Sequence, residues 1–466
     1  MQTCNSLFKA TTLYIIGSFF NKAIALLLLP FFTALLSTSS YGIVSTYTSW
    51  VNIVGILVSV QFGYTIRNAI VDFKSEINEY INCINIFCFI IYIILLGILF
   101  TTKTIISNND IIILTAFCLT QSFFNAVINV ELQKQMMQFE YIKRTCLLSL
   151  PNLLSAVIGV GILYYNRSAD YWGRIIPMVV VYSFIGGYYF LSYNISTKNM
   201  SIHKIKEYLR YALTLSLPLI LHGLASVVLS NIDKTMINYY ISSSETGIYS
   251  VAYTMGMVLL AVTSAMESVW IPWFTKKMKE EQYDSINIAG GFYIKIGSLI
   301  CVIALLCMPE ILKMFASKPY WQGIRIIFPI IFASYTIFLF TICANIECYY
   351  KSTKHIAVNT FVACICNVLL NAILIPKYAA LGAAYATMIS YLISFSMHYR
   401  YSKNLNKNIF PINIYLKPMT ITLTFFIVAD YLRYTSLIRW GIAGVILIIF
   451  LLYIYKYKNL VKAIRE

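Results

Sequence analysis

Long apolar stretches follow one another along almost the whole chain, and they constrain its architecture more than any other feature. A helix needs about 20 largely apolar residues to cross the hydrocarbon core of a bilayer. By that measure we expect fourteen membrane-spanning helices, at residues 11–35, 41–65, 81–100, 111–132, 146–165, 174–193, 209–232, 246–271, 287–308, 324–346, 355–375, 380–399, 412–430 and 437–455. Twelve spans are the alternative, if the last two helices lie at the membrane interface.

Composition excludes a water-soluble fold. Hydrophobic residues make up 59% of the sequence and charged residues only 11%, whereas a soluble protein carries about 25% charged residues. The first apolar run, from Thr11 to Leu36, is too long for a cleavable signal peptide and lacks a small-residue cleavage site. We therefore expect an all-α, polytopic membrane protein without a soluble domain.

The distribution of lysine and arginine predicts the orientation of the chain in the membrane. With the N-terminus inside, 23 of the 35 basic residues fall in cytoplasmic segments, 10 on the opposite side, and two, Lys22 and Lys295, within spans. Cytoplasmic loops of membrane proteins carry such an excess, so both termini are expected in the cytoplasm. The net charge of +17 is explained by this signal and by attraction to anionic lipid headgroups. It does not indicate a nucleic-acid partner.

Cysteine and histidine do not form a pattern typical of metal binding. Ten of the eleven cysteines lie in or beside apolar segments, and we interpret them as small packing residues. No histidine stands at ligand spacing from the pairs Cys364–Cys366 and Cys343–Cys348. We expect neither a metal site nor a cofactor.

One short motif occurs twice, 205 residues apart. The stretch "LSTSSYGIVSTYT" at 36–48 matches "ISSSETGIYSVAYT" at 241–254, with Ser37 on Ser242 and Gly42 on Gly247 among the shared residues. The first copy joins expected helices one and two, and the second joins helices seven and eight. Because six helices separate them, the two halves have the same orientation, as in transporters built from parallel repeats.

The repeat predicts the division of the chain. We expect an N-terminal six-helix lobe at 1–194, a polar cytoplasmic linker at 195–207 and a C-terminal six-helix lobe at 208–403. Residues 404–466 then form two extra helices and a cytoplasmic tail. In transporters of this kind the substrate site lies between the halves.

Several stretches resemble those of a known family, in the same order and at the same spacing over most of residues 10–400. They are "FNKAIALLLLPFFTALLSTSSYG", "NIDKTMINYYISSSETGIYSVAYTMG", "SVWIPWF" and "LIPKYAALGAAYATMISYLISF". The chain is similar to the O-antigen flippases of the Wzx type. These belong to the polysaccharide-transporter branch of the superfamily that also contains the multidrug and toxin extruders, the MOP exporters.

The resemblance implies a fold, a substrate and partners. Two six-helix lobes would form a V around a central cavity that opens alternately to the two leaflets. The substrate would be an oligosaccharide repeat unit on undecaprenyl diphosphate, moved from the cytoplasmic to the periplasmic leaflet of the bacterial inner membrane. Candidate partners are a polysaccharide polymerase, a chain-length regulator and a proton or sodium counter-ion.

The charges within the spans favour an anionic substrate. Lys22 is the deep charge of the first six spans, and a lysine near the bilayer midplane is a functional candidate by default. The family places a lysine at this position, and Asn21 lies on the same face of the expected helix. Lys295 is the corresponding candidate of the second half, with snorkelling to the headgroups as the alternative. We predict that these three residues contact the substrate.

Four further residues are candidates for gating or ion coupling. Asp233 and Lys234, which end expected helix seven, match an acidic–basic pair of the family; a local ion pair is the alternative. Glu267 and Glu347, which end expected helices eight and ten, are candidates for titration during ion coupling. Helix capping or pairing with Lys276 and Lys351 is the alternative for these two glutamates.

Other functions remain open at the level of the sequence. A different member of the superfamily would export drugs or a lipid-linked peptidoglycan precursor, but the scarcity of deep carboxylates argues against cationic drugs. His222, in the middle of expected helix seven, is the only histidine placed to relay a proton. A membrane enzyme such as a polysaccharide polymerase would need a large extramembrane loop with clustered Arg, His or Asp. The expected loops lack such clusters, so we predict a transporter and not an enzyme.

Overall fold

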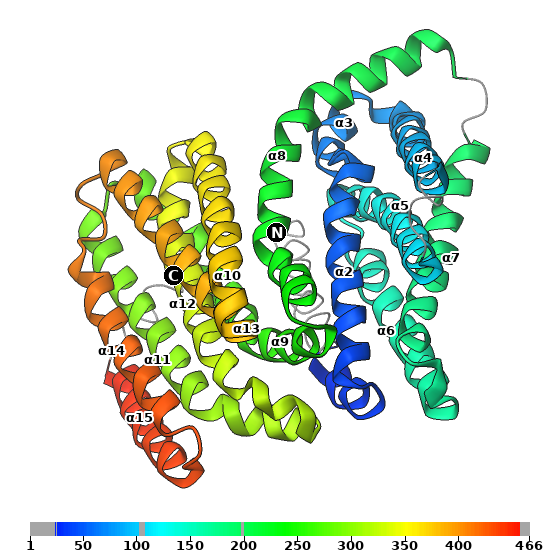
Figure 1. Ribbon diagram of the computed structural model, residues 1–466. Helices are drawn as coiled ribbons and strands as arrows, with labels where there is room; N and C mark the ends of the chain where they lie inside the picture. Colours follow the sequence, from blue (N-terminus) through cyan, green and yellow to red (C-terminus); the bar gives the residue numbers. More distant parts are fainter. Residues whose placement is uncertain (1–23, 25, 102–107, 197–199, 457–466) are drawn as a thin grey trace. The chain divides into compact units, whose positions relative to one another are not determined.

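The computed structural model describes residues 24, 26–101, 108–196 and 200–456 (Figure 1). This described part contains α-helices and short 3-10 helices and no strand. The chain divides into two compact units, Met1–Asn238 and Tyr239–Glu466. Each unit is described separately below.

The first unit is built from helices that pack mainly on α5. Helix α2 packs on α5, α5 on α7, and α6 on α7. A short helix, Leu26–Leu35, precedes the elements α2 (Thr38–Ser59), η1 (Phe62–Thr65), α3 (Ile66–Asp72), η2 (Lys74–Glu76), α4 (Ile77–Thr101), α5 (Asn109–Met137), α6 (Tyr141–Tyr165), η4 (Arg167–Ala169), α7 (Trp172–Ser196) and α8 (Ile202–Tyr240).

The second unit is centred on α12, because 83% of the residues in its most apolar stretch are buried inside the protein. Helices α9, α11 and α13 pack against it, and α14 and α15 pack against α11 (Figure 1). Its elements are α9 (Ser243–Gly256), α10 (Val258–Lys279), α11 (Tyr283–Phe315), η5 (Lys318–Gly323), α12 (Ile324–Tyr349), α13 (Thr353–Leu405), α14 (Asn413–Tyr431) and α15 (Ser436–Lys456).

The all-α membrane fold is confirmed, and each of the fourteen predicted spans coincides with helix, the first of them in its described part. Ten helices of the described residues are long and apolar enough to cross a membrane. Two details differ from the prediction. The span predicted at 246–271 consists of α9 and α10, which meet at Met257, and α2 ends at Ser59 because Val60 and Gln61 adopt left-handed backbone angles.

Helix α13 contains two predicted spans and the boundary between them. Ala379 has non-helical backbone angles (φ 51°, ψ −138°) and separates 355–375 from 380–399. Pro376 has no N–H and so cannot continue the helical ladder. Gly382 allows the two halves to approach closely, since a Cβ there would lie 2.3 Å from the carbonyl oxygen of Leu374.

The repeated motif forms the same local structure in both units. Ser37 is the N-cap of α2 and accepts a hydrogen bond from the N–H of Ser40 at 3.1 Å. Ser242 is the N-cap of α9 and accepts one from the N–H of Glu245 at 3.2 Å. A serine hydroxyl satisfies one of the unpaired donors at a helix start, so the shared serine explains why both helices begin at the equivalent residue. The predicted corners are confirmed.

Helix α8 belongs to the first unit by its contacts. Lys204 donates to Glu76 at 2.9 Å and to Glu79 at 3.1 Å, and the hydroxyl of Tyr208 donates to Glu76 at 2.7 Å. Phe73 adds an aromatic contact with Tyr208, the ring centroids lying 5.0 Å apart. The compact units therefore divide after Asn238. That the lobes which move during transport divide at the linker 195–207 stays a prediction.

Candidate functional site

A groove of about 370 Å³ lies between α11, α14 and α15 in the second unit. Its lining is almost entirely apolar and comes from all three helices. The lining residues are Lys295, Ile296, Ser298, Leu299 and Val302 of α11, Lys417, Pro418, Ile421 and Phe425 of α14, and Ile446, Ile449 and Phe450 of α15. The groove has the size of a small-molecule site and the surface chemistry of a site for hydrocarbon.

Two lysines are the charged members of this lining. Lys295 and Lys417 come from different helices, are both exposed, and line the same groove. No acidic residue is among the lining residues. Because a lysine ammonium is a compact positive charge on a flexible stem, the pair suits an anionic group that enters the groove together with an apolar chain.

A polar contact fixes α14 against α11 at the wall of the groove. The Ser298 hydroxyl lies 2.6 Å from the hydroxyl of Thr422 and donates to the carbonyl of Pro418 at 3.1 Å. The hydroxyl of Thr422 also donates to the carbonyl of Pro418, at 2.9 Å. These buried bonds link α14 to α11 at the wall of the groove.

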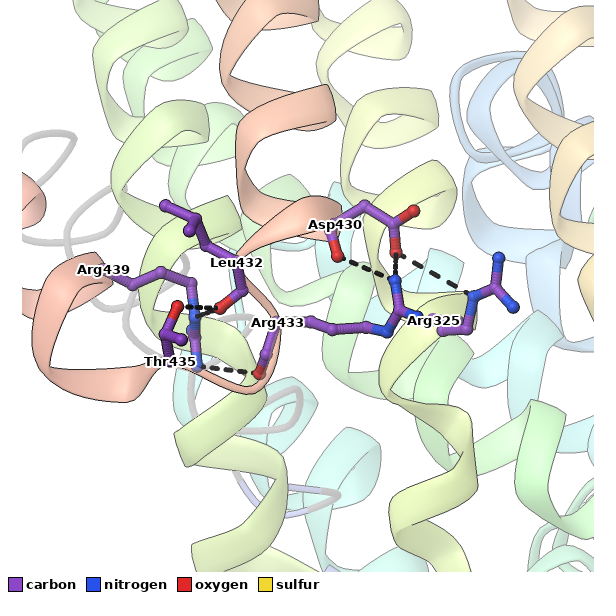
Figure 2. Close-up of polar contacts among 6 residues, drawn as sticks. All are labelled: Arg325, Asp430, Leu432, Arg433, Thr435 and Arg439. Carbon is purple, nitrogen blue, oxygen red and sulfur yellow. Dashed lines mark hydrogen bonds and ion pairs between the residues drawn. The ribbon is translucent and has the colours of Figure 1, made fainter.

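Arg439 anchors α15, the third wall of the groove. Its side chain is fully buried, and Figure 2 shows it reaching the carbonyls of Leu432 and Arg433 in the turn before α15. It also forms a bidentate ion pair with Glu310 of α11, in which one guanidinium nitrogen, Nη1, lies 2.8 Å from the carboxylate oxygen Oε2. In the same turn Arg433 pairs with Asp430 at 3.3 Å (Figure 2). Arg439 therefore positions α15 without lining the groove itself.

The structure places Lys295 in the groove, but Lys22 and Asn21 lie outside the described residues. Sequence reasoning missed Lys417, although it falls in the span expected at 412–430, because it was counted with the basic residues of the cytoplasmic side. The signal was present, since Lys417 is a charge within an apolar run. The predicted substrate contacts of Lys22, Asn21 and Lys295 stay predictions.

The position of the Asp233–Lys234 pair differs from the prediction. The pair was expected to end a helix, but α8 continues for six more residues, to Tyr240. Asp233 is buried, and its carboxylate accepts the backbone N–H of Lys234 at 2.9 Å. The gating role of these two residues stays a prediction.

Glu267 and Glu347 have partners that the sequence did not indicate. Glu267 does not end a helix: it lies in the interior of α10 and accepts a hydrogen bond from the hydroxyl of Thr341. Glu347 is fully buried and contacts His398, with 2.8 Å between the carboxylate oxygen and Nδ1. Among the described residues, Glu347 forms its ion pair with His398 and none with Lys351, the alternative partner. Their part in ion coupling stays a prediction.

His398 could have been found from a pattern on its own helix. Ser390, Ser394, His398 and Ser402 follow one another at intervals of four residues, and all four are buried. Residues four apart share a helix face, so the second half of α13 carries a polar stripe that faces other helices. His222, the histidine that its mid-span position favoured, lies partly buried in α8.

Comparison with known proteins assigns the family. Residues 7–278, more than half of the chain, match the model of the polysaccharide biosynthesis protein family. The chain belongs to this family. A Haemophilus influenzae protein of the Lsg locus is 25% identical over 362 residues, which cover 75% of this chain and 86% of the relative. The resemblance to polysaccharide transporters of the MOP superfamily is thereby confirmed.

Solved structures show that this member of the polysaccharide biosynthesis protein family has the fold of MOP transporters. The lipid II flippase MurJ, in an inward closed conformation, matches with a TM-score of 0.68 and 16% identity, over 97% of this chain and 100% of that one. An inward-facing multidrug resistance transporter of the MATE family matches with a TM-score of 0.56 and 13% identity, over 83% of this chain and 96% of that one. The protein is therefore a multi-pass membrane protein whose structural relatives are transporters.

Proposed function

We propose that this protein is a flippase for oligosaccharide repeat units linked to undecaprenyl diphosphate. It moves them from the cytoplasmic to the periplasmic leaflet of the bacterial inner membrane by alternating access, with both of its own termini in the cytoplasm. The groove of α11, α14 and α15 carries this proposal, because it combines a hydrocarbon-lined surface with two lysines. Released repeat units would serve a polysaccharide polymerase and its chain-length regulator.

The polar and apolar parts of such a substrate need different surroundings, and the groove offers both. A polar hydroxyl costs roughly 1–3 kcal/mol to bury without a hydrogen bond, and an unpaired charge costs far more. The diphosphate and the sugars therefore need a polar path, while the isoprenoid chain is stable in an apolar one. Lys295 and Lys417 offer a positive site next to the apolar lining of Ile421, Ile449 and Phe450.

The direction of transport is consistent with the membrane potential. Moving one negative charge outward across an inside-negative membrane is favoured by about 2.3 kcal/mol per 100 mV. A proton or sodium counter-ion is the proposed means of resetting the cavity. Glu267 and Glu347 are the proposed residues for that step, and Asp233 with Lys234 is the proposed gate pair. Lys22 with Asn21 is the proposed second contact for the diphosphate.

Export of cationic drugs is the alternative that the groove argues against. A site for a cation needs a negative or electron-rich partner, and the groove lining contains lysines and no carboxylate. A lipid-linked peptidoglycan precursor shares the lipid diphosphate and differs in its headgroup. The experiment below therefore measures which lipid-linked intermediate accumulates.

Substitution of the two groove lysines tests the proposal in cells. In a strain that lacks the chromosomal gene, the wild-type protein is expected to restore surface polysaccharide, while the Lys295→Ala, Lys417→Ala double variant restores less than a tenth. Two lost charge-assisted contacts of about 1.5–3 kcal/mol each account for a loss of at least tenfold. Lys295→Arg, which keeps the charge, is expected to retain part of the activity. The measurements are the amount of surface polysaccharide and of lipid-linked single repeat units.

Lys279→Ala is the matched control, since Lys279 is an exposed lysine of α10 in the same unit and lies outside the groove. It is expected to export at the wild-type level. All variants are compared at equal protein level in the membrane. Normal long-chain polysaccharide in the deletion strain itself, without a redundant transporter, contradicts the proposed function. Accumulation of a peptidoglycan precursor instead of repeat units assigns the other substrate.

A further inference from the structure

The first unit contains a second cavity, of about 300 Å³, whose lining differs entirely from that of the groove. We call it the amide cavity, because five carboxamide side chains line it. The lining residues are Val51, Asn52, Gly55, Ile56, Ser59, Gln61, Ser122, Asn125, Ala126, Ile128, Asn129, Leu132, Leu147, Leu148, Pro151, Asn152 and Tyr182. They come from α2 and the turn after it, and from α5, α6 and α7.

Three of the five amides, Asn52, Asn125 and Asn129, lie at exposed positions or have a buried atom without a hydrogen-bond partner; Asn52 also donates to the side chain of Asn231 in α8 at 3.4 Å. Asn52 and Asn129 are exposed within apolar helices, although a polar group that faces hydrocarbon costs free energy. Asn125 and Asn129 are four residues apart and so share one face of α5. The side-chain oxygen of Asn125 is buried and has no hydrogen-bond partner. Such a group is stable only if water or a ligand satisfies it.

Other polar groups of the lining are already held in place by the protein. The Tyr182 hydroxyl donates to the side-chain oxygen of Asn152 at 2.7 Å, and the Ser122 hydroxyl donates to the carbonyl of Val51 at 3.1 Å. Pro151 lacks an N–H, so the helical ladder of α6 leaves the carbonyl of Leu147 without its usual donor. The cavity therefore offers both donors and acceptors on fixed elements.

The charge of the lining narrows the ligand class. No Lys, Arg, Asp or Glu is among the lining residues. A carboxamide supplies one acceptor and two donors, and sugar hydroxyls both donate and accept. The ring of Tyr182 and the aliphatic side chains of Ile56, Leu147 and Leu148 offer apolar surface for the C–H faces of a pyranose. An anion has no counter-charge in this lining, and neither has a cation.

We propose that the amide cavity binds uncharged sugar residues of the transported glycan, through Asn125 and Asn129 above all. This inference rests on the proposed function and adds a site for the sugars, separate from the lysines that hold the lipid diphosphate. The repeat unit is then recognised by two kinds of chemistry, amides for the neutral sugars and cations for the anionic lipid.

Binding of two lipids to the full-length protein in detergent tests this site. One probe is undecaprenyl diphosphate, and the other is the same lipid carrying a neutral disaccharide. The wild-type protein is expected to bind the disaccharide lipid at least tenfold more tightly. The Asn125→Ala, Asn129→Ala double variant is expected to lose about tenfold in affinity for the disaccharide lipid, as two amide contacts disappear, and to bind the bare lipid as the wild type does.

Two further variants keep the test independent of folding. Asn129→Ala alone changes an exposed side chain, so it leaves the packing of α5 intact and is expected to weaken only the disaccharide lipid. Asn109→Ala, at the exposed start of the same helix, is the control and is expected to change neither affinity. The thermal unfolding midpoint of every variant is measured alongside.

The outcomes separate the two proposals. Equal affinity of the wild type for both lipids, unchanged in the double variant, overturns the sugar site and leaves the lipid-diphosphate transport standing. Failure of the wild type to bind either lipid overturns the proposed function. A third probe, the lipid with a uronic acid disaccharide, is expected to bind less tightly than the neutral one. Equal binding of these two contradicts the assignment to uncharged sugars.

Discussion

Arg439 is the single residue whose loss is expected to affect the second unit most. It is fully buried, pairs with Glu310, and donates to the carbonyl of Leu306 at 2.5 Å. Removing one partner of a buried ion pair costs about 3–5 kcal/mol, because the other charge stays unpaired. Arg439→Ala is therefore expected to lower the thermal unfolding midpoint in detergent.

Two further substitutions test whether the effect comes from the guanidinium group of Arg439. Arg439→Lys keeps the charge but loses the planar fork of donors, so it is expected to recover only part of the stability. Arg400→Ala, an exposed arginine at the end region of α13, is the control and is expected to leave the midpoint unchanged. An Arg439→Ala protein as stable as the wild type contradicts the anchoring role.

Contacts between residues far apart in the chain could not be predicted from the sequence. Glu310 and Arg439 are 129 residues apart, and Glu347 and His398 are 51 apart. No local periodicity connects such residues, since their contact depends on how α11, α12, α13 and α15 pack. The sequence did identify Lys295, because a charge within an apolar span is visible without knowledge of packing.

At the scale of elements, the break in α13 is the feature with the clearest structural requirement. A Cβ at residue 382 would lie 2.3 Å from the carbonyl oxygen of Leu374, which is backbone and cannot move away as a side chain does. Gly382→Ala is therefore expected to distort the break at Ala379 and lower the unfolding midpoint. Gly441→Ala in α15 is the matched control, because a Cβ there has no heavy atom within 4 Å. It is expected to be neutral or slightly stabilising, as alanine favours a helix over glycine by about 1 kcal/mol.

An unchanged unfolding midpoint in Gly382→Ala would show that the close approach at this glycine is not required.

The positions of the helices could be predicted from the sequence more fully than the breaks within them. The lengths of apolar runs located the helices, including the two within α13, because the bilayer sets a minimum length for each span. The junction of α9 and α10 at Met257 was not predicted, since the apolar run continues through it.

At the scale of the whole molecule, the repeated motif is the feature that connects sequence, structure and function. Ser37 and Ser242 cap equivalent helices in the two compact units. Parallel repeats are typical of transporters, and the family assignment and the MOP fold agree with that interpretation. The substrate could not be predicted from the repeat, because the groove and the amide cavity are built from residues of several helices in each unit.

Transport in proteoliposomes tests the central claim most directly. Vesicles are prepared with undecaprenyl-diphosphate-linked repeat units, and a membrane-impermeant glycosidase outside cleaves the sugars that reach the outer leaflet. With the wild-type protein, we predict that the protected inner-leaflet fraction is lost over time. Vesicles without protein, or with the Lys295→Ala, Lys417→Ala double variant, are predicted to retain it. A protected fraction that persists equally with the wild-type protein and in protein-free vesicles would contradict the account.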